Sequence, residues 1–202
     1  MFFEPRDGHG LPHDPFRAIV APRPIGWISS ISEAGIVNLA PYSFFNGVAS
    51  RPPMVMFVSE GIKDTIRNVQ ATGEFVVNLA TRPLAERMNE TSRAHDADIV
   101  EFEQAGLTPT PSRLVRPPRV AESPAALECK VTQIVPLTDL KGDPAERIMA
   151  IAEVVGIHID ESVLVDGLFD MTAAQTIARC GYWDYTEVTE VYSMPRPDLP
   201  DH

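Results

Sequence analysis

Runs of apolar residues alternate along the chain with glycine- and proline-rich turns, in a pattern typical of a β protein. Residues 24–31 are rich in β-forming side chains, and the glycine at the end of residues 33–35 suits a short hairpin loop. Residues 54–58 form an uninterrupted apolar run, which fits a strand covered on both faces. These two strands and their surroundings, residues 23–65, are the stretch around which the rest of the chain is organised.

Between these two strands, aromatic side chains alternate with small polar ones. The chain returns through residues 37–40 into residues 41–46, where Pro41 is expected to interrupt regular strand pairing. Backbone N–H groups that stay unpaired there are free to bind a ligand. The pattern therefore predicts an irregular binding segment at this place.

A short helix with a lysine at its start follows the second strand. Residues 66–71 have apolar side chains on one helical face, and Asp64 or Thr65 is expected to be the N-cap. A helix N-terminus offers unsatisfied N–H groups and the positive end of the helix dipole, so with Lys63 beside it this end can hold a phosphate. The alternative is that residues 63–65 only cap a surface helix.

The second half of the chain predicts two long strands. Residues 126–137 and 147–159, joined by a turn at 140–143, suit a barrel or a strongly curved antiparallel sheet. Gly73 is expected to end the preceding helix. The other predicted elements are a strand over 74–80, helices over 83–93 and 98–105, a short strand over 163–168 and an aromatic segment over 177–185 that needs a covered place.

Proline-rich segments are predicted to be irregular. Residues 1–22 form a lead-in that is expected to wrap over the body, and residues 194–202 form a frayed tail. Residues 108–124 hold five prolines and the densest positive patch of the chain, Arg113, Arg116 and Arg119. This segment is either an extended arm that crosses to a partner or covers a ligand, or a surface loop with solvated charges.

Length and charge restrict the possible classes of protein. The 202 residues suit a single domain over 1–202, and 17 Lys and Arg against 28 Asp and Glu give a net charge of -11. This charge repels nucleic acids and anionic membranes, so neither is an expected partner. With no basic and apolar leader and no apolar window of about 20 residues, the sequence is interpreted as that of a cytoplasmic protein.

No metal site or common catalytic motif is predicted. His9 and His13 are four residues apart, but Gly10 and Pro12 between them break any helix that would bring them together. Residues 95–98 (His-Asp-Ala-Asp) are more simply a cap for the following helix. Cys129 and Cys180 are expected to be free thiols, and the sequence has no GxSxG, P-loop, HExxH or GxGxxG motif.

Five motifs in a fixed order resemble those of a known family. They are residues 24–30 (PIGWISS), 38–45 (NLAPYSFF) after Gly35, 51–53 (RPP), 63–65 (KDT), and 178–181 (ARCG) followed by Tyr185. Together they resemble the flavin reductase-like family with the FMN-binding split-barrel fold, over nearly the whole chain. The resemblance implies a mainly β fold, a six-stranded antiparallel Greek-key barrel with peripheral helices, FMN as cofactor and a homodimer with the flavin near the interface.

The resemblance also implies a set of cofactor-binding residues. Ser29, Ser30 and residues 59–65 would hold the ribityl chain and phosphate, with Lys63 as charge partner. Asn38, Ala40, Pro41 and Ser43 would border the isoalloxazine ring, mainly through backbone groups. The full set is Trp27, Ser29, Ser30, Asn38, Ala40, Pro41, Ser43, Ser59, Lys63, Asp64 and Thr65. No catalytic side chain is implied.

The chain departs from the family pattern at two places. The family often has Ser-Thr where this chain has Ser29-Ser30, a change that keeps a hydroxyl. It also often has Arg-Leu-Gly-Gly where this chain has Arg-Cys-Gly-Tyr at residues 179–182. The missing second glycine affects the local backbone conformation and any nicotinamide contact there.

The activity that the resemblance implies is hydride transfer from NADH or NADPH to FMN, with the cofactor supplying the redox chemistry. Reduced flavin would then pass to a partner monooxygenase or stay bound. Two alternatives remain open at this point. One is an electron carrier that holds FMN and has no nicotinamide site, and the other is a split-barrel flavoprotein that oxidises a small substrate with oxygen.

Overall fold

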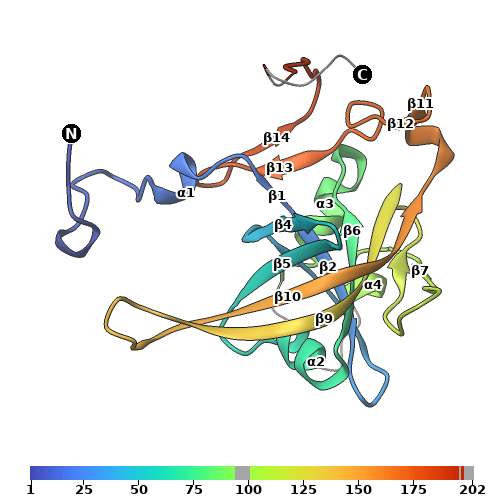
Figure 1. Cartoon of the computed structure of the whole chain (residues 1–202), viewed down its shortest axis with the longest axis horizontal. Helices are drawn as coiled ribbons and strands as arrows, with labels where there is room; N and C mark the ends of the chain where they lie inside the picture. Colours follow the sequence, from blue (N-terminus) through green and yellow to red (C-terminus); the bar gives the residue numbers. More distant parts are fainter. Residues whose placement is uncertain (94–100, 196, 198–202) are drawn as a thin grey trace.

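A curved antiparallel sheet of seven strands forms the body of the protein in the computed structural model, which describes residues 1–93, 101–195 and 197 (Figure 1). In spatial order the strands are β3 (Val37–Tyr42), β2 (Gly26–Ile31), β6 (Glu74–Leu79), β9 (Ala125–Thr138), β10 (Pro144–Ile159), β5 (Pro53–Glu60) and β4 (Phe45–Ser50). The predicted mainly β split barrel is confirmed. The sheet has one strand more than the six that the resemblance implies.

The sheet curves until its two ends approach each other. Gly26 of β2 lies against the ring of Phe45 in β4, and a Cβ atom on this glycine would be 2.6 Å from the Phe45 ring. Glycine therefore permits the close approach that closes the barrel on this side. The interior is apolar, and Phe57 and Phe75 meet there edge to face with 5.3 Å between ring centroids.

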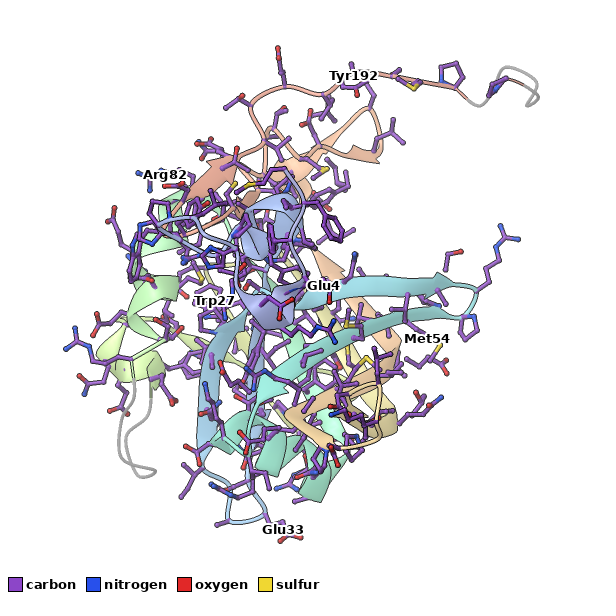
Figure 2. All side chains as sticks on the ribbon, turned by 90° about the vertical axis from the view of Figure 1, so that its left-hand side faces the viewer. Glu4, Trp27, Glu33, Met54, Arg82 and Tyr192 are labelled. Carbon is purple, nitrogen blue, oxygen red and sulfur yellow. The ribbon has the colours of Figure 1, made fainter. Side chains whose placement is uncertain are left out.

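Short helices cover the sheet. Helix α2 (Asp64–Thr72) packs Ile66 and Val69 against the barrel interior, and Gly73 ends it in the left-handed conformation with φ 71°, as predicted. A second apolar cluster joins the outer side of β2 to α3 (Ala85–Glu90) and α4 (Glu101–Gln104). Trp27 is fully buried in this cluster, whereas Glu33 lies at the tip of the β2–β3 hairpin (Figure 2).

Two segments predicted to be irregular are strands. β3 runs through Pro41, which is tolerated because β3 is an edge strand. The N–H of Leu39 points away from β2, toward Glu101, and the nitrogen of Pro41 two residues on faces the same way, so no ladder bond is lost. Residues 45–46 belong to β4, which pairs with β5.

Three short strands, one near the start of the chain and two near its end, form a separate small sheet. It consists of β1 (Arg23–Pro24), β13 (Ile177–Arg179) and β14 (Tyr185–Glu187). The lead-in holds only η1 (Pro5–Asp7) and α1 (Phe16–Ile19), is largely exposed, and extends away from the sheet instead of wrapping over it (Figure 1). The aromatic segment is not covered within this chain either, since Trp183 is 88% exposed.

The proline-rich segment over residues 108–124 lies on the chain's own sheet. It contains the two-residue strands β7 (Pro109–Thr110) and β8 (Arg119–Val120), and Val120 N donates to the buried Asn78 Oδ1 at 2.8 Å. We call residues 108–124 the arm. It neither extends freely nor forms a simple solvated loop, because buried polar side chains of the sheet hold its backbone.

The remaining elements have only two or three residues each. They are η2 (Arg82–Leu84), η3 (Glu161–Val163), β11 (Leu164–Val165) and β12 (Leu168–Phe169). Both cysteines are free thiols, and burial raises the pKa of Cys129. The predicted cap at residues 95–98, the start of the helix predicted over 98–105 and most of the tail lie outside the described residues.

Within the described part of the chain, no helix is both long and apolar enough to cross a membrane. In the same residues, no group of three or more His, Cys, Asp or Glu side chains is placed to hold a metal ion.

Candidate functional site

A cavity of about 490 Å³ lies between the edge strand β3 and the N-terminus of α2. Six predicted cofactor-binding residues line it together: Asn38, Ala40, Pro41, Lys63, Asp64 and Thr65. Seven further residues, which are not among the eleven predicted ones, complete the lining: Tyr42, Ile62, Arg67, Thr91, Ser92, Arg93 and Glu101. We call this the α2 cavity.

The start of α2 presents backbone donors to this cavity. Lys63 is the N-cap, with an extended backbone (φ −101°, ψ 172°), so the prediction of Asp64 or Thr65 as N-cap is wrong by one or two residues. Its side chain makes no capping hydrogen bond. The N–H groups of the first turn therefore have no side-chain cap and are available, with the positive end of the helix dipole, to an anion.

Three cationic side chains surround the cavity, and they differ in how far their charge is neutralised. Arg67 pairs with Asp64 one turn back, and Arg93 Nε lies 2.9 Å from Glu90 Oε1. Lys63 has no ion-pair partner among the described residues. Its ammonium group is therefore the charge in this cavity that is most available to a ligand.

A buried polar network fixes β3 to the start of α2. With its amide oriented so that every group is paired, Asn38 donates to Glu101 Oε1 at 3.0 Å and accepts from Thr65 Oγ1 at 2.8 Å. Glu101 Oε2 accepts from Leu39 N at 3.2 Å. Burial raises the pKa of the Tyr42 hydroxyl, against the opposing effect of hydrogen bonds with Thr65 and Ser59. The cavity wall is therefore held rigidly on this side.

Four other predicted residues do not line this cavity; they are buried and bonded within the protein. Trp27 Nε1 donates to Thr91 Oγ1 at 3.0 Å, Ser29 Oγ donates to Pro118 O, and Ser59 Oγ donates to Gly61 O at 2.9 Å. Ser30 Oγ accepts from Asn68 Nδ2 at 3.1 Å. Trp27 thus positions Thr91, which lines the cavity, and direct contact of these four with a cofactor stays a prediction.

Ser43 lies in a neighbouring hollow of about 410 Å³ with Arg23 and Phe44. Arg23 is buried there and donates to the carbonyls of Arg17, Val20 and Cys180, which ties the lead-in to the small terminal sheet. The contact of Ser43 with a flavin ring also stays a prediction.

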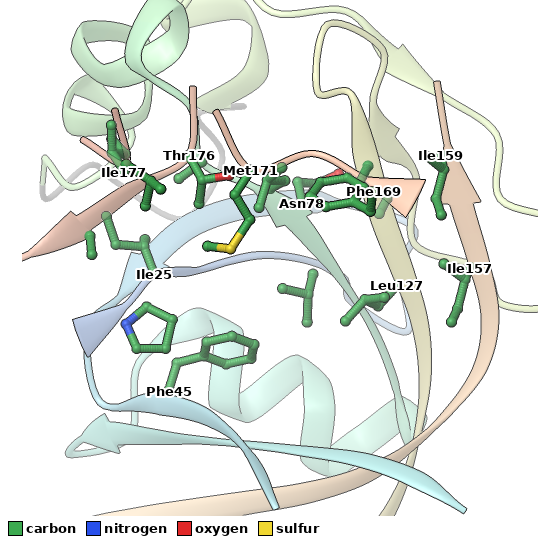
Figure 3. A pocket seen from close by; sticks show the side chains of 18 of the residues that line it. Ile25, Phe45, Asn78, Leu127, Ile157, Ile159, Phe169, Met171, Thr176 and Ile177 are labelled. Carbon is green, nitrogen blue, oxygen red and sulfur yellow. The ribbon is translucent and has the colours of Figure 1, made fainter. Parts of the chain in front are cut away.

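A third cavity, of about 460 Å³, lies at the end of the barrel where Phe45, Leu127 and Ile157 converge (Figure 3). Its described lining residues are apolar apart from Asn78 and Thr176, and none of them is charged. A phosphate would have no cationic partner in this cavity. The α2 cavity is consequently the better candidate for a cofactor with a phosphate group.

Comparison with known proteins finds a family and relatives that this chain resembles. A family model described as a flavin reductase like domain matches residues 18–176. A relative from Halalkalibacterium halodurans, itself uncharacterised, is 37% identical over 186 residues, which cover 89% of this chain and 88% of that protein.

Two solved structures share the whole fold. Nitrilotriacetate monooxygenase component B from Bacillus cereus has a TM-score of 0.86 at 28% identity and covers 96% of this chain and 98% of its own. The 2-nitrobenzoate 2-nitroreductase NbaA from Pseudomonas fluorescens has a TM-score of 0.80 at 30% identity, with coverages of 92% and 91%.

Proposed function

This chain belongs to the flavin reductase-like family, and we propose that it binds FMN in the α2 cavity and passes hydride from NADH or NADPH to the flavin. Family membership makes the chain a flavin-related oxidoreductase. The observation that carries the proposal is the meeting of Lys63, an uncapped helix N-terminus and the edge of β3 in one cavity.

The residues present fit the cofactor. The first-turn N–H groups of α2 and the ammonium group of Lys63 are suited to the phosphate, because both supply positive charge without an internal partner. On β3 the outward N–H of Leu39 is already taken by Glu101 and Pro41 has no N–H, so this edge offers carbonyl oxygens, which suit the N–H group of a flavin ring. Thr91 and Ser92 also line the cavity; their hydroxyl groups donate to Met88 O and Asn89 O and can still accept a hydrogen bond.

The carboxylate groups in this cavity do not oppose the assignment. Asp64 is paired with Arg67, and Glu101 accepts hydrogen bonds from Asn38 and Leu39 on β3. Both carboxylates are therefore held by protein donors, so the unpaired lysine sets the local preference for an anion.

FMN, when bound, supplies the hydride chemistry at its ring. The chain's own part is to bind and orient the cofactor: Lys63 and the start of α2 fix one end, and the Asn38–Thr65–Glu101 network keeps β3 in place at the other. None of the lining residues needs to act as an acid or base. We propose that the reduced flavin then serves a separate monooxygenase component, as the name of the Bacillus cereus neighbour suggests for that protein.

Anaerobic absorbance spectroscopy tests the proposed activity. Purified protein with FMN is expected to show a bound-flavin spectrum that bleaches when NADH or NADPH is added, and the effective nucleotide identifies the donor. A bound-flavin spectrum that persists with both nucleotides contradicts the reductase and favours the electron carrier. Product formation from a small substrate and oxygen, without a partner oxygenase, would favour a flavoprotein that oxidises a small substrate with oxygen.

We further propose a homodimer, because the aromatic segment of the C-terminal part lacks a cover within one chain. Trp183 is 88% exposed and Tyr192, on the segment that leaves the body in Figure 2, is 84% exposed. Light scattering after size exclusion is expected to give twice the mass of one chain, and Trp183→Ala is expected to shift the protein toward the monomer. A monomeric wild-type protein at high concentration rejects the dimer.

A further inference from the structure

A second polar cavity, of about 490 Å³, lies between the arm and the paired ends of β9 and β10. Its charged or titratable lining residues are Arg113, Arg119, Glu128, His158 and Asp160. It shares no described lining residue with the α2 cavity. We call it the arm cavity, and it is a different site from the one proposed for FMN.

Glu128 forms the floor of the arm cavity and is fully engaged by its neighbours. The residue is 0% exposed, and its carboxylate accepts from Arg113 N at 2.8 Å, Leu114 N at 2.6 Å and His158 Nε2 at 2.5 Å. Burial raises the pKa of this carboxyl group, but the two backbone N–H groups and His158 together outweigh that effect and hold the pKa below its usual value. The charge of Glu128 is thus compensated without either arginine side chain.

The two arginine side chains of the arm cavity lack acidic partners. Neither Arg113 nor Arg119 forms an ion pair within the described residues, although the chain carries 28 acidic residues. Arg119 uses Nη2 to donate to Pro111 O at 3.3 Å, whereas its Nε atom is buried and has no hydrogen-bond partner in the described part of the chain. Because this Nε atom is shielded from solvent, the donor that Arg119 can offer to a ligand in the cavity is Nη1, which makes no hydrogen bond in the described part of the chain.

Asp160 is the other acidic residue that lines the arm cavity. Its Oδ1 atom accepts from Ser162 N at 2.8 Å, and this bond caps the short helix η3. The carboxylate is therefore oriented toward its own backbone rather than toward the guanidinium groups. Neither guanidinium group is ion-paired with Glu128 or Asp160, so both are available to a negatively charged ligand.

We propose that the arm cavity binds a small organic or inorganic anion that carries a carboxylate or phosphate group, with Arg113 and Arg119 as its principal donors. Guanidinium groups match the planar oxygens of such anions and bind them with paired hydrogen bonds. Arg119 is half-buried and Arg113 is exposed, so Arg119 is the donor that solvent screens less. The proposal is independent of the flavin chemistry.

Isothermal titration calorimetry on the full-length, FMN-loaded protein tests this site with two probes, inorganic phosphate and succinate. If FMN fills the α2 cavity, as proposed above, the phosphate probe reports on other sites. At least one probe is expected to bind, and Arg119→Gln is expected to weaken it at least about tenfold, since a charge-assisted hydrogen bond is lost. The preferred probe tells whether a phosphate or a carboxylate is the better ligand.

Two variants keep the result interpretable. Arg116→Gln is the matched control, because Arg116 lies on the same arm and its side chain does not line the cavity, so binding is expected to stay as in the wild type. Arg119→Lys keeps the charge and is expected to bind with intermediate affinity. Circular dichroism shows whether each variant is folded.

Three outcomes would overturn the proposal. The first is that neither probe binds the wild-type protein, and the second is that Arg119→Gln and Arg119→Lys, both folded, bind as tightly as the wild type. The third is that binding survives both arginine changes but is abolished by Lys63→Ala, since the anion then sits in the α2 cavity. None of these results bears on whether FMN is reduced by a nicotinamide nucleotide.

Discussion

Replacement of Glu128 by alanine is expected to destabilise the fold by about 3 kcal/mol or more at neutral pH. The change leaves the N–H groups of Arg113 and Leu114 without their acceptor, and it removes the partner of His158. Because the arm is held to the sheet largely by such buried acceptors, its backbone should loosen as well. Chemical denaturation of the wild type and the variant measures the difference.

A matched control separates this effect from the simple loss of a carboxylate on the sheet. Glu153 lies on β10, is half-buried, and makes no hydrogen bond through its carboxylate in the described part of the chain, so Glu153→Ala is expected to change stability by no more than about 0.5 kcal/mol. Glu128→Gln keeps one acceptor oxygen and should lie between the two. Equal losses in the Glu128 and Glu153 variants would show that the buried bonds are not the cause.

The direction of the pH dependence follows from the pKa of Glu128. Its pKa in the folded state lies below the ordinary value of 4.5, so its stabilising contribution is present above that value and is lost as the pH falls through the folded-state pKa. The stability gap between the wild type and Glu128→Ala should therefore narrow on acidification. A gap that stays constant from neutral to acidic pH would mean that lost packing, and not lost charge, explains the effect.

Local patterns were enough to predict most of the strands. The long hairpin is an example, since the predicted strands over 126–137 and 147–159 match β9 (Ala125–Thr138) and β10 (Pro144–Ile159). Here apolar periodicity and turn residues agree, and pairing partners are adjacent in sequence. The prediction of an irregular segment at Pro41 was wrong. The lost backbone hydrogen bond of a proline destabilises an inner strand but not an edge strand, and only the whole sheet shows that β3 is at an edge.

The arm was harder to interpret for a similar reason. Its prolines correctly indicated the absence of long regular elements, but its attachment depends on Asn78, Glu74 and Glu128, which lie on other strands. Such side chains carry no mark in the sequence that distinguishes them from solvent-exposed polar residues. In the sequence, His158 is simply a polar residue on a predicted strand. Only the fold shows that it contacts the buried carboxylate of Glu128.

Some residues of the candidate site could be predicted from a local sequence signal, and others could not. Residues 63–65 could be identified because a lysine directly before an amphipathic helix is a local signal, and Arg67 lies one turn further on the same helix. Ser92, Arg93 and Glu101 come from segments that only the tertiary structure brings to the α2 cavity. Trp27, Ser29 and Ser30 were placed by position in a motif, yet their side chains are bonded inside the protein.

Lys63→Ala is expected to weaken FMN binding by about 1.5–3 kcal/mol, which corresponds to roughly a 10- to 150-fold higher dissociation constant. The ammonium group is the unpaired cation of the α2 cavity in the described structure, so no neighbouring charge can replace it without first leaving Asp64 or Glu90. Fluorescence titration of FMN into the wild-type and Lys63→Ala apoproteins gives the two dissociation constants to be compared. Lys63→Arg should keep most of the affinity.

Lys141→Ala is the matched control, because Lys141 lies in the turn between β9 and β10 and does not line the α2 cavity. If FMN affinity is unchanged in a folded Lys63→Ala protein, the phosphate is held elsewhere, and the assignment of the α2 cavity fails. If riboflavin, which lacks the phosphate, binds both proteins equally while FMN distinguishes them, the lost interaction belongs to the phosphate. The helix N-terminus would then supply the remaining affinity, since its N–H groups are intact in the variant.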